Sequence, residues 1–274
     1  MTGAAMDDAA LPFATPGPSA APAAIEATNV SVSYRLRLDE GTVKGALRKL
    51  VRPRSSSDRL VPAVRDVSFS LPRGEVLAVI GRNGAGKSTL LRVIAGILAP
   101  ERGRVVVRGK MSLLAPGIGF DANLTGRENI VLGGLAAGLE PERLEVLVDD
   151  IAEFAQLGEY INYPMRTYSQ GMKGRLGFAV AAHLDPEILL IDEALGGGDA
   201  AFTEKSKLKM AELCGQGRTI VIVTHGLTSV RTMATQAMWM HQGRVAYHGD
   251  PDEAIARYLR YCRLENLDQM PDDL

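Results

Sequence analysis

One stretch decides the fold of this chain: Gly81-Arg82-Asn83-Gly84-Ala85-Gly86-Lys87-Ser88-Thr89. It matches the phosphate-binding loop pattern G-x-x-x-x-G-K-[ST]. Residues 75–80, directly before it, predict a short buried strand, and the dense apolar residues over 90–98 predict a buried helix after it. The alternative is an ordinary glycine-rich turn between strand and helix. The Lys-Ser-Thr ending disfavours that alternative.

The chemistry of the loop follows from its residue types. Glycines allow successive backbone amides to point into one concavity, and the following helix adds the partial positive charge of its N-terminus. Lys87 is then expected to reach the β- and γ-phosphates of a nucleoside triphosphate, Ser88 to ligate Mg²⁺ and Thr89 to contact the α-phosphate. The loop residues expected to contact the nucleotide are Gly81, Asn83, Gly84, Ala85, Gly86, Lys87, Ser88 and Thr89.

Composition limits the classes of protein that need to be considered. The 274 residues are 46% apolar, enough for one large domain or two modest ones, and the net charge of −1 argues against bulk nucleic-acid binding. Cys214 and Cys262 lie too far apart for metal-ligand spacing and fit a reducing compartment. No apolar run approaches the roughly 20 residues of a membrane-spanning helix, and no secretory signal is evident. These features predict a soluble, cytoplasmic protein.

The order of the predicted elements indicates an α/β fold. Residues 1–24 predict a disordered Ala/Pro-rich tail, and residues 263–274 an acidic C-terminal tail. Strands are expected at 25–34, with Val30, Val32 and Tyr34 on one face, and at 63–71, which is expected to pair with the strand before the loop. Further strands are expected at 105–107, 111–114, 187–191 and 219–223, with a hairpin at 239–248 that turns near 242–243.

Predicted helices cluster in the middle of the sequence. They fall at 128–139, 142–155 and 172–183, and a last helix is expected at 250–262. The cluster indicates a helical subdomain over about 115–184, inserted within the α/β core. Alternation of strands and helices elsewhere predicts a mostly parallel core sheet flanked by helices, with an antiparallel β part.

An insertion over about 36–61 follows the first strand. Residues 42–51 place Val43, Leu47, Leu50 and Val51 on one narrow stripe of a helix, with basic residues on the other side. Such a basic amphipathic helix can lie at a membrane surface or dock on a partner. It can equally be a solvated surface helix whose stripe packs on its own domain. The pattern alone does not separate these alternatives.

A phosphate loop needs an acidic partner for Mg²⁺ and a group that organises the attacking water. The apolar strand at 187–191 is followed directly by Asp192 and Glu193. Asp192 is expected to hold a Mg²⁺-bound water, and Glu193 to act as general base or water-positioning group. An acidic helix N-terminus after a strand is the alternative.

Tyr168-Ser169-Gln170-Gly171-Met172 resembles the signature of ABC transporters, commonly Leu-Ser-Gly-Gly-Gln, and it follows the loop in the order that this family uses. Ser169, Gln170 and Gly171 open a predicted helix, so they are expected to form a second anion site at a helix N-terminus. In this family the signature of one subunit closes over the nucleotide held by another. The resemblance therefore implies a P-loop NTPase of ABC type that works as a head-to-tail homodimer with two composite ATP sites.

Further positions match the family between residues 25 and 225. His225 matches the switch histidine that contacts the γ-phosphate, and Asp199 matches the aspartate loop that links the two sites. Tyr34 matches the aromatic residue that stacks on adenine. One motif departs from the family, because residues 111–120 contain no glutamine where most members carry one. The signature also departs, with Gln170 in place of the usual glycine.

Together with the segments at 124–130, 162–169 and 192–195, these departures resemble one branch of the family. The branch consists of the ATPase subunits of O-antigen, teichoic acid and capsular polysaccharide exporters. That branch carries a so-called gate helix near the membrane interface, which residues 42–51 fit, and basic residues there suit anionic headgroups. Some members add a C-terminal carbohydrate-binding domain, which is not expected here. Within the branch, the chain is most similar to the ATPases of actinobacterial exporters of lipid-linked galactan for the cell wall.

The resemblance implies a peripheral ATP hydrolase on the cytoplasmic face of the membrane. It would bind ATP and Mg²⁺, pair with a separate multi-spanning permease and power export of a lipid-linked polysaccharide. Two alternatives remain: the ATPase of another transporter, or a soluble ABC-type ATPase acting on DNA or ribosomes. No heptads separate the loop from the signature, and only one ATPase domain is predicted, so the second alternative is disfavoured.

Overall fold

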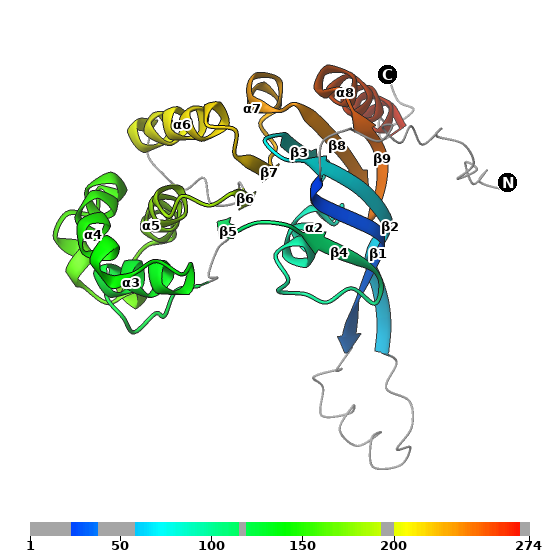
Figure 1. The fold of residues 1–274 in the computed structure, drawn as a ribbon. Helices are drawn as coiled ribbons and strands as arrows, with labels where there is room; N and C mark the ends of the chain where they lie inside the picture. The colour runs from blue at the N-terminus through cyan, green and yellow to red at the C-terminus, as the bar shows by residue number, and fades with distance from the viewer. Residues whose placement is uncertain (1–22, 38–57, 115–118, 193–199, 269–274) are drawn as a thin grey trace, which may run out of the picture.

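The computed structural model describes residues 23–37, 58–114, 119–192 and 200–268 (Figure 1). These residues form a three-stranded sheet, a six-stranded sheet, helices that cover the sheets, and a helical part (residues 126–183) to one side, whose last helix (Gln170–His183) packs on the larger sheet. Within these ranges no helix has the length and apolar character that a bilayer crossing requires.

The smaller sheet is antiparallel and has the order β2-β1-β4. Its strands are β1 (Ala23–Arg37), β2 (Asp58–Pro72) and β4 (Arg102–Val107). Strands β1 and β2 form a long ribbon that projects away from the rest of the molecule in Figure 1, and Tyr34 pairs with Val61 along it. Val30 and Val32 are buried as expected, but Tyr34 is 37% exposed.

The expected pairing of residues 63–71 with the strand before the loop is wrong. Those residues belong to β2, which pairs with β1 in the smaller sheet. The chain changes sheets after Pro72, where Gly74 has φ +77° and the next strand, β3 (Val76–Ile80), enters the larger sheet. A turn built on a left-handed glycine makes that change of direction possible.

The larger sheet has the order β5-β6-β7-β3-β8-β9, with all neighbours parallel except β8 and β9. Every residue of β3 and of β6 is buried, because helices cover both faces of the sheet. This arrangement confirms the predicted α/β fold class. The other strands are β5 (Met111–Leu114), β6 (Ile188–Asp192), β7 (Thr219–Val223), β8 (Gln236–His241) and β9 (Arg244–Gly249).

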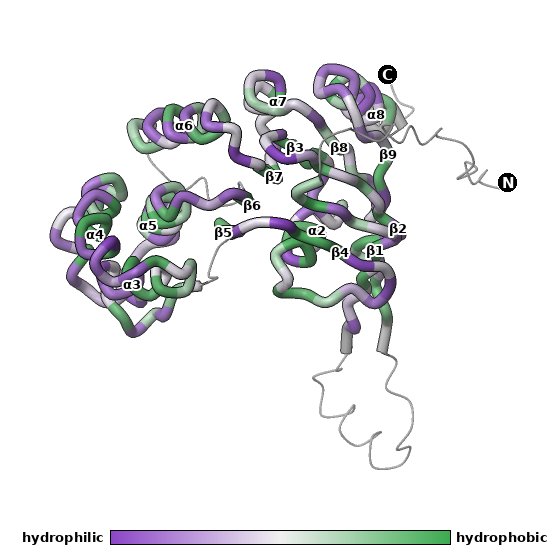
Figure 2. Tube along the Cα trace, in the orientation of Figure 1, coloured by the Kyte–Doolittle hydropathy of each residue, from purple (hydrophilic) through white to green (hydrophobic). Residues whose placement is uncertain are grey.

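Helix α2 (Lys87–Ile94) lies between the two sheets. Its apolar residues, coloured green in Figure 2, share one buried cluster with residues of β1, β2 and β3. The opposite face of the larger sheet is covered by α6 (Ala200–Gly215), α7 (Leu227–Met233) and α8 (Pro251–Asp268). The core that positions the phosphate loop is therefore shared by both sheets.

The helical subdomain has an apolar core of its own. It contains α3 (Gly126–Ala136), α4 (Pro141–Ala155), the 3-10 turns η1 (Gly158–Asn162) and η2 (Met165–Thr167), and α5 (Gln170–His183). A capping box starts α3, since the Thr125 hydroxyl accepts from the Glu128 amide and the Glu128 carboxylate accepts from the Thr125 amide. Buried Asn129 then ties the preceding loop to α3 through its side-chain amide.

Some boundaries differ from the sequence prediction. The helix after the loop spans 87–94 rather than 90–98, and the last helix continues to Asp268 instead of ending at Cys262, so the acidic tail does not begin at 263. Helices α6 and α7 were not predicted from the sequence. The helix predicted at 42–51 lies outside the described residues, and positions 36–37 and 58–61 of the expected insertion belong to β1 and β2.

Candidate nucleotide-binding site

The phosphate loop connects the end of β3 to the start of α2. Gly81 has φ +143° and Gly86 has φ +98°, and a Cβ at either position would overlap a backbone carbonyl oxygen, that of Met240 or of Ala63. Gly84 also has a positive φ, +80°, but faces open space. The glycines of this loop therefore serve two purposes, since two of them allow close backbone packing and the third allows only the turn.

Lys87 lies at the centre of the loop and is 6% exposed. Its ammonium donates to the carbonyl oxygens of Gly81 at 2.7 Å and Arg82 at 3.0 Å. An ammonium has three donors, so one remains for a ligand. Burial lowers the pKa of Lys87, and the negative charge of Asp192 opposes that shift. The loop thus holds a positive charge beside its own amides.

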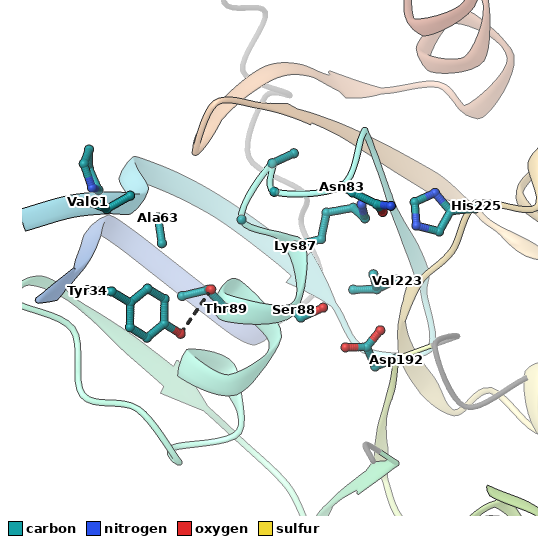
Figure 3. Close-up of a pocket in the computed structure, with 14 residues that line it drawn as sticks. Tyr34, Val61, Ala63, Asn83, Lys87, Ser88, Thr89, Asp192, Val223 and His225 are labelled. Carbon is teal, nitrogen blue, oxygen red and sulfur yellow. Dashed lines mark hydrogen bonds between the residues drawn. The ribbon is translucent and has the colours of Figure 1, made fainter. Parts of the chain in front are cut away.

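The loop forms one wall of a pocket with a volume of about 400 Å³ (Figure 3). Strand β1 contributes Tyr34, the end of β6 contributes Asp192, and the segment after β7 contributes His225. Sequence reasoning had selected all three. Among the described residues, the lining consists of Tyr34, Val61, Pro62, Ala63, Asn83, Gly84, Ala85, Gly86, Lys87, Ser88, Thr89, Asp192, Val223 and His225.

Sequence reasoning missed Val61, Pro62, Ala63 and Val223. The first three lie on β2, where Val61 is opposite Tyr34 and Pro62 is opposite Ser33 in the β1–β2 ribbon. The signal that could have found them is the pairing of the first two strands, which the sequence analysis assigned differently. The position of Val223 at the end of β7, beside the tip of β6, follows from the parallel order of the sheet.

Ser88 and Asp192 supply oxygen atoms at the inner end of the pocket. Asp192 is 7% exposed, and Figure 3 shows its carboxylate facing the Ser88 hydroxyl. Among the described residues no group of three or more His, Cys, Asp or Glu side chains could form a metal cage. Mg²⁺ is typically held by one or two carboxylates together with phosphate oxygens and water, so this pair fits Mg²⁺ beside a bound phosphate.

Tyr34 and His225 occupy opposite ends of the pocket (Figure 3). The Tyr34 hydroxyl lies 3.3 Å from the Thr89 hydroxyl, which fixes the ring at the edge of the loop. His225 is exposed and follows Thr224, whose amide donates to the Val79 carbonyl oxygen at 3.2 Å. That bond continues the pairing of β7 with β3 and holds the histidine at the carboxyl edge of the sheet.

The signature residues lie on the helical subdomain and do not line this pocket. Ser169 is the N-cap of α5, and its hydroxyl accepts from the Met172 amide at 3.2 Å. Ser169 and Gln170 are exposed, whereas the preceding Tyr168 is buried and donates to the Tyr160 carbonyl oxygen at 2.6 Å. Burial raises the pKa of the Tyr168 hydroxyl. The segment therefore presents the start of α5, with Gly171, to solvent on a rigid support.

Two predicted site residues, Glu193 and Asp199, lie outside the described residues. Their roles as water-positioning group and as link between two sites stay predictions. The nucleotide contacts expected of the other predicted site residues also stay predictions.

The sequence and the fold of this chain are both similar to those of known ATP-binding transport proteins. The ABC transporter family model matches residues 64–196. The chain is 42% identical over 210 residues to the teichoic acids export ATP-binding protein TagH of Bacillus cereus, covering 77% of this chain and 38% of the relative. It is 43% identical over 241 residues to the O-antigen export system ATP-binding protein RfbB of Myxococcus xanthus, covering 86% of this chain and 55% of the relative.

A further TagH protein, from Listeria innocua, is 40% identical over 227 residues that make up 83% of this chain and 67% of the relative. The chain thus spans between 38% and 67% of the length of these relatives. Among solved structures, a dimeric ATP-binding cassette in a post-hydrolysis state has a TM-score of 0.67 at 21% identity, over 83% of this chain and 98% of that one. The fold, the phosphate loop and these similarities together show that the chain belongs to the ABC transporter family.

Proposed function

We propose that this chain is the ATP-hydrolysing subunit of an exporter of lipid-linked polysaccharide. The observation that carries the proposal is the pocket that brings Tyr34, the phosphate loop, Asp192 and His225 together. Such a pocket offers a ring for a base, amides and an ammonium for phosphates, and a histidine near the expected terminal phosphate. Each feature matches one part of ATP.

In the proposed complex, adenine stacks on Tyr34 and the phosphates lie along the loop. The free donor of Lys87 binds a β- or γ-phosphate oxygen, and His225 contacts the γ-phosphate. Mg²⁺, held by Ser88 and through water by Asp192, would neutralise the charge on the phosphates. Glu193 accepts a proton from the water whose oxygen attacks the γ-phosphorus, the bond to the leaving oxygen breaks, and ADP and phosphate form.

The exposed start of α5 supports a homodimer. Ser169, Gln170 and Gly171 lie at a helix N-terminus that suits an anion, yet within this chain they are not part of the pocket. A second copy, placed head to tail, would bring them onto the γ-phosphate with Asp199 linking the two sites. Hydrolysis would then reopen the dimer and drive a separate membrane-spanning permease, with this chain on its cytoplasmic face.

The cargo is proposed from the similarity to exporters. The relatives described above are named for export of teichoic acids and of O-antigen, and we infer a cargo of the polysaccharide class for this chain. Lipid-linked galactan, the cargo indicated by the resemblance of the sequence, stays a prediction within that class. The helix predicted at 42–51 would meet the headgroup of the lipid carrier or the membrane surface.

The ATPase part of the proposal is tested with Glu193→Gln. We expect the variant to bind ATP, to hydrolyse it at least about a hundredfold more slowly because the proton acceptor is missing, and to accumulate as an ATP-bound dimer in size-exclusion chromatography. Glu187→Gln is the matched control, because Glu187 lies on the surface in an ion pair with Arg73 at 3.0 Å. Hydrolysis by Glu193→Gln at the parental rate would remove Glu193 from the mechanism.

The transport part is tested by purifying the tagged chain from detergent-solubilised native membranes, followed by mass spectrometry. We expect a multi-spanning protein and a polyprenyl-linked glycan in the same complex, and the glycan identifies the cargo. Recovery of ribosomal proteins or DNA without a membrane partner would contradict the export role while leaving the ATPase chemistry intact.

A further inference from the structure

A second hollow, with a volume of about 830 Å³, opens on the smaller sheet. It shares no residue with the nucleotide pocket. Four strands meet around it, namely β1, β2, β4 and the start of β9, which lie side by side in Figure 1. Its lining is Thr28, Asn29, Ser31, Asp66, Arg102, Gly103, Arg104 and Arg244.

Positive charge dominates this hollow. Its described lining residues include three arginines, Arg102, Arg104 and Arg244, and one carboxylate, Asp66, although the chain as a whole has a net charge of −1. None of the three guanidinium groups has an ion pair or a side-chain hydrogen bond with another described residue. By contrast, Arg108, directly after β4, is paired with Glu26 of β1 at 3.1 Å. The three arginines are therefore available to a ligand.

The backbone beneath these arginines is preformed. Asn29 and Asp66 have positive φ angles of 51° and 53°, in bulged parts of β1 and β2. A Cβ on Gly103, which has φ +79°, would overlap the carbonyl oxygens of Thr28 and Asn29. The Asp66 amide donates to the Ser31 hydroxyl at 3.0 Å. Left-handed positions at non-glycine residues cost about 1 kcal/mol each, so these strands hold a defined and somewhat strained shape.

The residue types select a class of ligand. Guanidinium groups match the oxygens of a phosphate with a planar fork of donors. Asp66, Asn29 and the hydroxyls of Thr28 and Ser31 suit the hydroxyl groups of a sugar. Among the described lining residues none is aromatic or apolar, so the hollow has nothing to stack a base or to bury an apolar peptide side chain.

We propose that this hollow is a binding site for a phosphorylated sugar. The phosphate lies against Arg102, Arg104 and Arg244, and sugar hydroxyls donate to Asp66. The site goes beyond the proposed ATPase function, because it uses a different sheet face and different chemistry. It offers the protein a means of recognising a glycosyl phosphate directly.

The test is titration of glucose 1-phosphate into the full chain saturated with ADP, followed by calorimetry at constant ionic strength. ADP occupies the β-phosphate position of the loop, and the double arginine variant described next distinguishes phosphate bound in the hollow from phosphate bound beside ADP. We expect one-to-one binding that weakens at least about tenfold in Arg102→Gln/Arg244→Gln, since charge-assisted hydrogen bonds are lost. The matched control, Arg260→Gln/Arg263→Gln on α8, makes the same change of charge at exposed positions and should bind like the parent.

Two further measurements separate the sugar from the phosphate. Asp66→Asn should weaken binding of glucose 1-phosphate but leave binding of inorganic phosphate unchanged. Inorganic phosphate that binds as tightly as glucose 1-phosphate would overturn the assignment of a sugar. Absence of binding, or equal loss in the control variant, would overturn the site itself.

Discussion

The starts of α2 and α5 are two helix N-termini with opposite designs. Helix α2 begins after Gly86, which has a left-handed conformation and no side chain to cap the first amides. Helix α5 begins after Ser169, which is extended and caps its own helix by accepting from the Met172 amide. The start of α2 lies within a pocket walled by two sheets, whereas Ser169 and Gln170 are exposed.

The difference shows which helix start is complete within one chain. At α2 the amides are left for a ligand, and buried Lys87 adds a positive charge beside them. At α5 one amide is already satisfied, and the remaining groups face outward on a support fixed by Tyr168. The start of α2 has the donors of a phosphate site within one chain. The start of α5 has some of those donors but lies outside the pocket, so it would need a second chain to reach a phosphate. Substitutions at three places, Lys87, the loop glycines and Ser169, test this comparison.

The largest effect is expected from Lys87→Ala. We expect kcat/KM for ATP to fall by at least about a hundredfold, because a preorganised charged donor is removed from the phosphates. The free energy of unfolding should change by less than about 1 kcal/mol, since relief of the desolvation that lowers the pKa of Lys87 offsets the loss of two hydrogen bonds. Phosphate release and urea denaturation measure the two quantities.

Lys110→Ala is the control, because Lys110 is exposed on the surface away from the pocket. It should leave both quantities unchanged. If Lys87→Ala unfolded the protein, Lys87 would be a structural residue that holds the start of α2 in place.

The second test is a pair of substitutions that separates two glycines of the loop, Gly86 and Gly84. Gly86→Ala should lower the free energy of unfolding by about 3 kcal/mol, because a left-handed position and a clash with the Ala63 carbonyl oxygen act together. Gly84→Ala has the same conformational penalty but open space around it, so we expect a cost of about 1 kcal/mol. Urea denaturation at an unchanged m-value measures both. Equal costs would mean that the contact between the loop and β2 is unimportant.

The parts of the molecule that the sequence predicts well are local. The strand, loop and helix around Lys87 follow from residues that are neighbours in the chain, and the position of Asp192 follows from an apolar strand that ends in an acid. Asp192 and Tyr34 could be assigned to the same pocket through the family resemblance, and the structure brings both to it.

The parts that the sequence did not predict depend on distant pairing. The alternation of apolar and polar residues in β2 is compatible with pairing to β1 or to β3. The sequence pattern therefore could not reveal that Val61 and Ala63 would face the phosphate loop. Helix α6 was missed because its buried residues, Phe202, Met210 and Leu213, are widely spaced among charged ones. Its burial is decided by the sheet beneath it, and local pattern carries little of that information.

The smallest effect on ATP turnover is expected at the second helix start. Ser169→Ala removes the acceptor for the Met172 amide and should lower the free energy of unfolding by about 1 kcal/mol, whereas Ser169→Gly should cost only a few tenths of a kcal/mol. If Ser169 also completes the ATP site of a second copy, both variants lose the same hydroxyl and ATP turnover should fall by about tenfold in each.

The two variants therefore separate capping from catalysis, and Ser169→Thr, which keeps a hydroxyl in both roles, should restore turnover in large part. Turnover that follows stability, reduced in Ser169→Ala and parental in Ser169→Gly, would show that the hydroxyl acts only as a cap. In that case the start of α5 would be a structural feature of the helical subdomain, and the contrast with α2 would be one between a site and a well-capped helix.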